Sequence, residues 1–438
     1  MSNKKILLTI LPVFWPKMPT LGISYLQVYL KDKSINADIL DLNNTFFNLS
    51  GEDIKKSWFI SCNTFLEENI LSLIKNEHSD KFYESINKML QYDIVGFSCF
   101  KSNFKTTIEV IKMLKFRKNS IKIILGGPEI ARQYFKSGKR ISNEIKEIAD
   151  FIVVGEGEKS VYDYVEERIE KGTVRVFSQL ENLDNIPYPE FTETNLNNYQ
   201  KTSAIPLLFT RGCIRKCGFC SEKLLFKGFR SRSVVSVINE IKYHRENKDI
   251  KYFIFFDSML NADVNKLEEL CDEIINNFGS INWEAQIAVR NDMDINLFKK
   301  MKKSGCYNLF IGLESGSENT LKRMNKGFTA FDAENFFKKL IDADLFFGIS
   351  IIVGYPGETE EDFWDSLNFV IQRKNIIPKI EQINPFTYYD GTDTDVSFDY
   401  KTNPESMKRM GIFVEQIKKH SFKYTNAFLG NLIEKAGT

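Results

Sequence analysis

The chain has 438 residues, of which 43% are hydrophobic and 27% are charged. This composition is that of an ordinary globular protein with room for two or three domains. The near balance of 59 basic and 58 acidic residues argues against nucleic acid or an anionic membrane as the main partner. No apolar run approaches the roughly 20 residues that a membrane span needs. The scattered cysteines outside one cluster suit a reducing compartment, so we expect a cytoplasmic protein.

The first half of the chain alternates short apolar runs with stretches of helical spacing. The apolar runs are typical of buried strands and lie at 4–13, 37–42, 94–97, 121–125 and 151–154. Helical spacing marks 21–31, 104–117 and 130–147, and the more polar residues 43–90 are predicted to form a helical insertion. The alternation predicts an α/β domain with a doubly wound parallel sheet of flavodoxin-like or Rossmann-like type.

A second series of strands and helices follows a linker rich in Pro and Asn. Strands are predicted at 207–210, 251–256, 282–288, 307–312, 347–353 and 379–384. Six β-α units of this length favour a partial (β/α)6 barrel over a second open sheet. The predicted parts are a Rossmann-like domain at 1–185, a linker at 186–204, the barrel at 205–390 and a short helical tail at 391–438, which could cap the barrel mouth.

Three cysteines lie within eight residues at the start of the predicted barrel. Cys213, Cys217 and Cys220 are spaced C-x3-C-x2-C. Three thiolates on one loop can hold three irons of a cubane cluster and leave the fourth iron open to a ligand. A structural zinc site usually takes four protein ligands, and no fourth Cys or His lies nearby. The spacing therefore predicts an iron–sulfur cluster.

Polar residues and glycines gather where the predicted strands end, which is where such folds bind ligands. Carboxylates there suit ribose hydroxyls or an ammonium group, an arginine suits a carboxylate, and Ile352 with Gly354 offers an apolar edge to an adenine. Each residue alone fits a helix cap or a tight turn equally well. The combination favours a ligand site.

The second half of the chain resembles the radical S-adenosylmethionine superfamily. The resemblance rests on the C-x3-C-x-aromatic-C loop with Phe219, and on Gly312-Leu-Glu-Ser-Gly316, Asn325-Lys-Gly327 and Gly354-Tyr-Pro-Gly-Glu-Thr359. With Gly155-Glu-Gly-Glu158, the whole chain resembles the branch that carries an N-terminal cobalamin-binding-type domain. The resemblance implies a [4Fe–4S] cluster on the three cysteines, and reductive cleavage of S-adenosylmethionine to a 5′-deoxyadenosyl radical.

The resemblance also implies two sets of cofactor-binding residues. S-adenosylmethionine is expected to contact Phe219, Asp257, Ser258, Gln286, Arg290, Glu314, Ser315, Ile352 and Gly354. Cobalamin is expected at Pro12, Trp15, Ser98, Gly126, Gly127, Gly155, Glu156 and Gly157.

The chain departs from histidine-ligated cobalamin domains in one respect. It has no D-x-H-x-x-G string, and its only histidines are His78, His244 and His420. We therefore expect water or no ligand in the lower axial position of a bound cobalamin, with Trp15 and the Ser98–Ser102 loop covering that face. A scaffold that binds no cobalamin is the alternative.

Three functions remain open. The first is cobalamin-dependent methylation of an unactivated carbon or a phosphorus centre. The second is a radical cyclisation, rearrangement, coupling or oxidation without methylation, and the third is a non-catalytic iron–sulfur sensor or electron carrier. A methylthiotransferase fits less well, because the first half holds no second cysteine set. The expected partners are a small-molecule, peptide or lipid-precursor substrate and an electron donor such as flavodoxin or ferredoxin.

Overall fold

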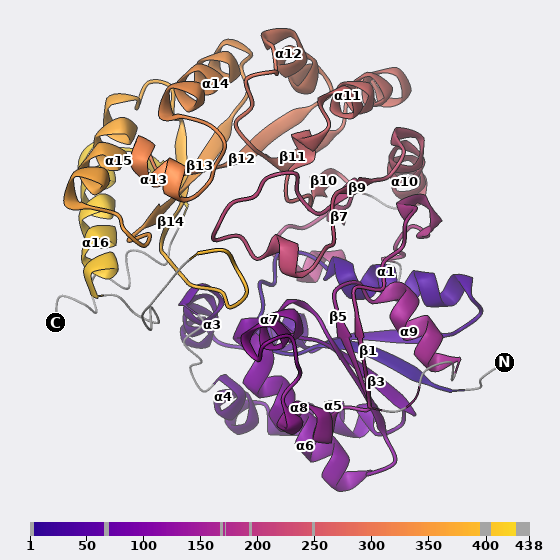
Figure 1. The fold of residues 1–438 in the computed structure, drawn as a ribbon. Coiled ribbons are helices and arrows are strands. Elements are labelled where there is room, and N and C mark those ends of the chain that lie inside the picture. Colours follow the sequence, from indigo (N-terminus) through magenta and orange to yellow (C-terminus); the bar gives the residue numbers. More distant parts are fainter. Residues whose placement is uncertain are drawn as a thin grey trace. The chain divides into compact units, whose positions relative to one another are not determined.

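The computed structural model describes residues 4–64, 70–166, 170, 172–191, 195–247, 250–394 and 404–425. The chain divides into two compact units (Figure 1). The first unit is Met1–Pro206 with Leu224–Lys227, and the second is Leu207–Lys223 with Gly228–Thr438. None of the helices in the described ranges has the length and apolar run that crossing a bilayer takes.

The first unit contains a six-stranded parallel sheet in the order β2-β1-β3-β4-β5-β6. Its strands are β1 (Ile6–Ile10), β2 (Ala37–Asp41), β3 (Ile94–Ser98), β4 (Lys122–Gly126), β5 (Phe151–Val154) and β6 (Thr173–Val176). The predicted doubly wound architecture is confirmed. The sequence does not predict β6, because that strand is only partly buried and lacks a clear apolar run.

Helices cover both faces of this sheet. They are α1 (Leu21–Asp32), α2 (Leu42–Leu49), α3 (Glu52–Thr64), α4 (Ile70–Glu77), α5 (Ser79–Met89), α6 (Phe104–Arg117), α7 (Pro128–Lys136), α8 (Asn143–Ile148) and α9 (Glu158–Val165). Successive residues of β1 belong to two different hydrophobic clusters. Leu7 lies in the cluster that contains Trp58 of α3, and Leu8 lies in the cluster that contains Ile23 of α1. Burial on both faces explains why these strands are apolar throughout.

The second sheet has seven strands in the order β15-β14-β13-β12-β11-β10-β7, and its pairs from β10 to β15 are parallel. The strands are β7 (Ala204–Leu207), β10 (Tyr252–Phe255), β11 (Asn282–Ile287), β12 (Cys306–Glu314), β13 (Phe347–Val353), β14 (Lys379–Pro385) and β15 (Lys423–Tyr424). The helices are α10 (Val234–Asn247), α11 (Val264–Phe278), α12 (Ile295–Lys303), α13 (Glu318–Arg323), α14 (Ala330–Asp342), α15 (Glu360–Gln372) and α16 (Pro404–Lys419). Sequential strand order with intervening helices confirms the predicted α/β fold class.

Short polar side chains begin most of the helices that follow these strands. Each of them accepts a hydrogen bond from a backbone amide in the first helical turn, which satisfies a group that the helix leaves unpaired. The capping residues are Asp263, Asp294, Ser317, Thr329 and Thr359. Because each cap lies beyond the end of a strand, helix starts and strand ends gather at one edge of the sheet.

Two local features differ from the sequence prediction. The first barrel strand begins three residues earlier than the predicted 207–210 and includes Pro206. β7 is an edge strand, where a proline need not break the hydrogen-bond ladder. Thr210 and Arg211 form instead a short strand, β8 (Thr210–Arg211), which pairs antiparallel with β9 (Arg230–Ser231).

The predicted helix at 130–147 is also two helices, α7 and α8. Gly138 and Lys139 lie between them with φ angles of 65° and 61°. A left-handed backbone of this kind ends a helix.

Candidate functional site

The cysteine loop follows β8 and is held by the turn after α13. The amide of Gly218 donates to the carbonyl of Met324 at 2.9 Å, and the Asn325 side chain donates to the Lys216 carbonyl at 2.8 Å. Arg215 donates to the carbonyl of Gly327 at 2.9 Å and to that of Val289 at 2.7 Å. The Asn325-Lys-Gly327 motif therefore fixes the backbone between the cysteines.

Glycine at 327 is required by that contact. Its φ angle is 69°, and a Cβ there would lie 2.4 Å from Nη1 of Arg215. Any other residue would push the guanidinium away from the turn.

All three loop cysteines are partly buried, free thiols. Burial raises the pKa of Cys213, and it raises the pKa of Cys220 to about 12. Within the described ranges, no three His, Cys, Asp or Glu side chains converge as ligands of a single metal ion. A cubane cluster does not require such convergence, because each cysteine binds a different iron. Three thiols with no fourth protein ligand are thus the donor set of a cluster with one open iron.

A buried carboxylate lies at the end of β12. Glu314 is 9% exposed and has a φ angle of 72°, at a register shift between β12 and β13. Its carboxylate accepts a hydrogen bond from Ser350 at 2.9 Å and lies 3.6 Å from the Lys326 ammonium. A left-handed backbone at a residue other than glycine costs about 1–3 kcal/mol and is concentrated at functional sites.

The glycines of Gly312-Leu-Glu-Ser-Gly316 accommodate this arrangement. A Cβ at Gly312 would lie 2.5 Å from the Glu314 carboxylate, and one at Gly316 would lie 2.4 Å from Cβ of Phe369 on α15. The first glycine therefore leaves room for the carboxylate, and the second allows α15 to pack closely.

Lys326 links this carboxylate to the cysteine loop. Its ammonium lies 5.6 Å from the ring centroid of Phe219, which immediately precedes Cys220, and 5.5 Å from that of Phe328. Lys326 is only 8% exposed, so its charge is held by the two rings and by Glu314. Lys326 belongs to the Asn325-Lys-Gly327 motif but is not among the predicted cofactor contacts.

An apolar cluster adjoins the loop. Phe219 and Ile352 pack against the buried residues Met324, Tyr355 and Phe386. The Tyr355 ring is perpendicular to both Phe219 and Phe386, at centroid distances of 6.3 and 5.1 Å. Two predicted S-adenosylmethionine contacts, Phe219 and Ile352, are thus brought together on one apolar surface.

The segment after β13 is fixed by the C-terminal helix. The Glu358 carboxylate accepts one hydrogen bond from the Gly354 amide at 2.8 Å and another from the Arg409 side chain of α16 at 2.9 Å. A Cβ at Gly354 would lie 1.8 Å from Oγ of Ser406, also on α16. Helix α16 of the expected tail therefore packs against this strand end of the second unit.

Two other predicted cofactor residues, Asp257 and Arg290, bond mainly within the protein. Asp257 is buried and accepts hydrogen bonds from the Phe209 and Thr210 amides, and burial raises its pKa to about 6. Arg290 donates through all three nitrogens, to Asp292 and to the carbonyls of Asn261 and Ala262. Their contacts with S-adenosylmethionine stay predictions, and the geometry favours structural roles.

Ser315 likewise has a structural partner. It is buried, and its hydroxyl lies 2.6 Å from that of Ser366 on α15. Gln286 is exposed on β11. Ser258 is partly buried and forms a hydrogen bond with Glu222. Burial raises the pKa of Glu222, and the hydrogen bond offsets only part of that rise.

In the first unit, the residues expected to bind cobalamin follow β1, β3, β4 and β5, which are adjacent in the sheet. They therefore share one edge, as predicted for a ligand site at strand ends. They are Pro12 and Trp15 after β1, Ser98 at the end of β3, Gly126 and Gly127 at β4, and Gly155, Glu156 and Gly157 after β5. The three histidines lie elsewhere: His78 before α5, His244 within α10 and His420 after α16.

The helical insertion fixes the loop after β1. Asn43 accepts from the Phe14 amide at 2.7 Å, and the indole of Trp58 donates to the Phe14 carbonyl at 3.0 Å. The Phe14 ring stacks on Phe100 with centroids 3.9 Å apart. Trp15 is partly buried and lies 5.7 Å from Phe59, centroid to centroid. The insertion, whose role the sequence does not reveal, thus orients aromatic side chains at the strand ends.

Comparison with known proteins identifies the second unit. Residues 207–370 match the family described as the Radical SAM superfamily. An uncharacterized methyltransferase of Pyrococcus horikoshii is 27% identical over 357 residues, 74% of each chain. The ribosomal protein uS12 methylthiotransferase RimO of a Thermoanaerobacter species is 25% identical over 390 residues, 85% of this chain and 84% of that one.

Two solved structures share the fold. The radical S-adenosylmethionine methyltransferase TsrM from Kitasatospora setae has a TM-score of 0.67 at 15% identity, over 87% of this chain and 73% of that one. The cobalamin-dependent S-adenosylmethionine radical enzyme OxsB has a TM-score of 0.63 at 16% identity, over 94% of this chain and 56% of that one. Residues 207–370 thus form a radical S-adenosylmethionine domain, as the sequence predicts. The cofactors of its superfamily are S-adenosylmethionine and a [4Fe–4S] cluster.

Proposed function

We propose that the enzyme cleaves S-adenosylmethionine reductively at a [4Fe–4S] cluster held by Cys213, Cys217 and Cys220, and that it carries out cobalamin-dependent methylation of an unactivated carbon or a phosphorus centre. The observation that carries the first part is the anchoring of the cysteine loop. Arg215, Gly218 and Asn325 tie its backbone to the strand-end turn that also carries Lys326.

When bound, the cluster supplies one electron that breaks a carbon–sulfur bond of S-adenosylmethionine, and the corrinoid supplies a methyl group. The protein's share is binding, orientation and exclusion of water. Glu314 offers a buried acceptor for ribose hydroxyls, and Lys326 offers a positive charge for the carboxylate of the methionine part. Ile352 and Gly354 offer an apolar edge and a fixed backbone to the adenine.

A corrinoid site in the first unit is supported by the shared edge of four strand ends and by the glycines there. Gly127 and Gly155 have φ angles of 100° and 102°, which favour glycine and keep the loops tight. The one histidine of the first 206 residues, His78, precedes α5 and follows none of these four strands. We therefore propose water or no ligand in the lower axial position, with Trp15, Phe14 and Phe100 as apolar cover.

Several relatives are named methylthiotransferases, and that activity is a competing proposal. The first 206 residues contain two cysteines, Cys62 and Cys99, both buried. Burial raises the pKa of both thiols. Two separate buried thiols do not form a second cluster site, so we favour methylation.

Product analysis separates these outcomes. The protein is reconstituted anaerobically with iron and sulfide, supplied with hydroxocobalamin and reduced with dithionite in the presence of S-adenosylmethionine and candidate substrates. Methylation predicts a bound corrinoid spectrum and formation of both 5′-deoxyadenosine and S-adenosylhomocysteine. Formation of 5′-deoxyadenosine alone, with no effect of cobalamin on turnover, would favour the non-methylating radical reaction.

A further inference from the structure

The side chain of Tyr355 lies beside the cysteine loop and has no part in the proposed reaction so far. Tyr355 is buried, two residues after the end of β13. Its ring packs with Phe219 and Phe386 in the apolar cluster that adjoins the loop. Its hydroxyl is therefore a polar group among apolar rings, which is a costly position unless the hydroxyl has a partner.

The Tyr355 hydroxyl lies against the backbone between the second and third cysteines of the loop. A Cβ at Gly218, the residue after Cys217, would lie 3.2 Å from the Tyr355 hydroxyl oxygen and 3.7 Å from that of Thr394. Burial raises the pKa of Tyr355, its contact with Thr394 offsets part of that rise, and the charge of the Cys217 thiolate adds to it. The hydroxyl is thus within electrostatic reach of the Cys217 sulfur.

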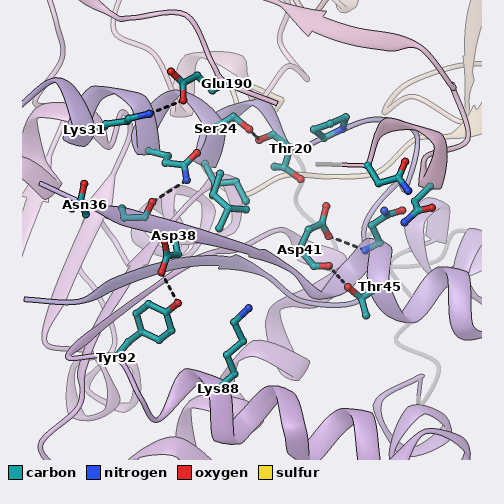
Figure 2. A pocket seen from close by; sticks show the side chains of 18 of the residues that line it. Thr20, Ser24, Lys31, Asn36, Asp38, Asp41, Thr45, Lys88, Tyr92 and Glu190 are labelled. Carbon is teal, nitrogen blue, oxygen red and sulfur yellow. Dashed lines mark hydrogen bonds and ion pairs between the residues drawn. The ribbon is translucent and has the colours of Figure 1, made fainter. Parts of the chain in front are cut away.

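The protein holds the proton of this hydroxyl only weakly. The Tyr355 oxygen lies 3.3 Å from the Thr394 hydroxyl and 3.5 Å from the Arg323 carbonyl, beyond the roughly 2.5–3.0 Å of a normal O–H···O hydrogen bond. Tyr92 of the first unit, by contrast, donates to the Asp38 carboxylate at 2.6 Å (Figure 2). In the described part of the chain, the Tyr355 proton therefore has no acceptor as strong as that carboxylate.

The segment after β14 keeps the two hydroxyls beside the loop. Thr394 is buried, and its neighbour Asp393 forms an ion pair with Lys223, three residues after Cys220. The ion pair is exposed to solvent and adds little stability by itself. Together with the approach of Thr394 to Gly218, it places the segment next to the cysteine loop on both sides of Cys220.

We propose that the Tyr355 hydroxyl donates a hydrogen bond to the Cys217 thiolate when the cluster is bound, and that this hydrogen bond raises the reduction potential of the cluster. The inference rests on the proposed function, because it takes Cys217 as an iron ligand. A thiolate is charged and accepts a proton more strongly than a neutral hydroxyl or carbonyl does. Hydrogen bonds to the sulfurs help to set the potential of an iron–sulfur cluster. Since reduction adds negative charge, the donor stabilises the reduced state more than the oxidised state.

A redox titration followed by electron paramagnetic resonance tests this hydrogen bond. The full chain is reconstituted anaerobically and poised at the wild-type midpoint, where half of the cluster is reduced. Tyr355→Phe removes only the hydroxyl, and is expected to lower the ratio of reduced to oxidised cluster about three- to tenfold, the size of one net hydrogen bond. Tyr307→Phe makes the same change on β12, where the hydroxyl donates to Glu284 at 2.8 Å, and is expected to leave the ratio unchanged.

A second substitution at the same position changes the ratio in the opposite direction. Incorporation of 3-fluorotyrosine at position 355 keeps the ring and the hydroxyl but makes the hydroxyl a stronger donor, so the ratio is expected to rise. Iron content is expected to match the wild type in all three proteins. A ratio that either substitution of Tyr355 leaves unchanged would overturn this inference alone, whereas a wild type that holds no cluster would overturn the proposed function as well.

Discussion

Replacing Gly327 by alanine tests whether the turn after α13 holds the cysteine loop. Gly327 and Gly279 both have a φ angle of 69°, so an alanine is strained at either position, by about 1–2 kcal/mol or more. A Cβ at Gly327 would lie 2.4 Å from Nη1 of Arg215, whereas nothing lies within 4 Å of a Cβ at Gly279. Only Gly327→Ala therefore displaces Arg215 from its carbonyl partner, a further loss of about 1.5–3 kcal/mol for a charged hydrogen bond.

The assay combines urea unfolding of the metal-free protein with iron content after anaerobic reconstitution. Gly279→Ala is expected to lower the free energy of unfolding by the backbone strain alone and to bind iron normally. Gly327→Ala is expected to lose stability beyond its own backbone strain and to retain less iron. In an Arg215→Ala background the extra loss should disappear, because the interaction that alanine breaks is already absent. A stability loss of Gly327→Ala that is the same with and without Arg215, or equal iron content in the two glycine variants, would refute the anchoring role.

Three further changes test the strand ends. Trp58→Phe keeps the buried ring but leaves the Phe14 carbonyl without its donor, so stability falls by about 1–3 kcal/mol, and hydroxocobalamin binding, followed by absorbance, weakens. Burial alone would raise the pKa of Asp362, but its hydrogen bonds lower it to about 2. Asp362→Asn therefore loses roughly 2 kcal/mol at neutral pH, and the wild type loses the same amount as pH falls from about 4 to 2. Arg409→Ala frees Glu358 and raises KM for S-adenosylmethionine more than it lowers kcat.

Two of these changes have controls on exposed charged neighbours. Asp365→Asn and Lys408→Ala alter the residues after Asp362 and before Arg409, and are expected to leave stability and KM close to the wild type. Three results would contradict the reasoning: an unchanged affinity for hydroxocobalamin in Trp58→Phe, an acid transition of Asp362→Asn identical to the wild type, or an unchanged KM in Arg409→Ala.

The overall architecture could be predicted because strands buried on both faces leave continuous apolar runs in the sequence. The runs at 94–97 and 151–154 coincide with β3 and β5 within one residue. β6 and β15 were not predicted, because both strands are short and incompletely buried and so leave no apolar run in the sequence. The first barrel strand was predicted three residues too late, because the sequence does not show that Pro206 lies in an edge strand.

The site was predictable only where residue type and spacing already carry the chemistry. Cysteine spacing marks the loop, but the partners of Arg215 lie 74 and 112 residues away, and no local pattern reveals them. The sequence does not distinguish a strand-end carboxylate that binds a ligand from one that bonds within the protein. Asp257 is of the second kind, because it accepts hydrogen bonds from backbone amides. Gly312 supported the family resemblance, and it also indicates a role for Glu314, because a glycine two residues before that carboxylate leaves space for its side chain.

The most direct test is the formation of 5′-deoxyadenosine by the anaerobically reconstituted, dithionite-reduced enzyme. We predict that the wild type releases it from S-adenosylmethionine, and that alanine at Cys213, Cys217 or Cys220 abolishes both its formation and the cluster spectrum. Cys271→Ala, a buried cysteine of α11, should retain both. A wild-type protein that holds its cluster but forms no 5′-deoxyadenosine, or a Cys217→Ala variant that still forms it, would contradict the proposed role of the loop.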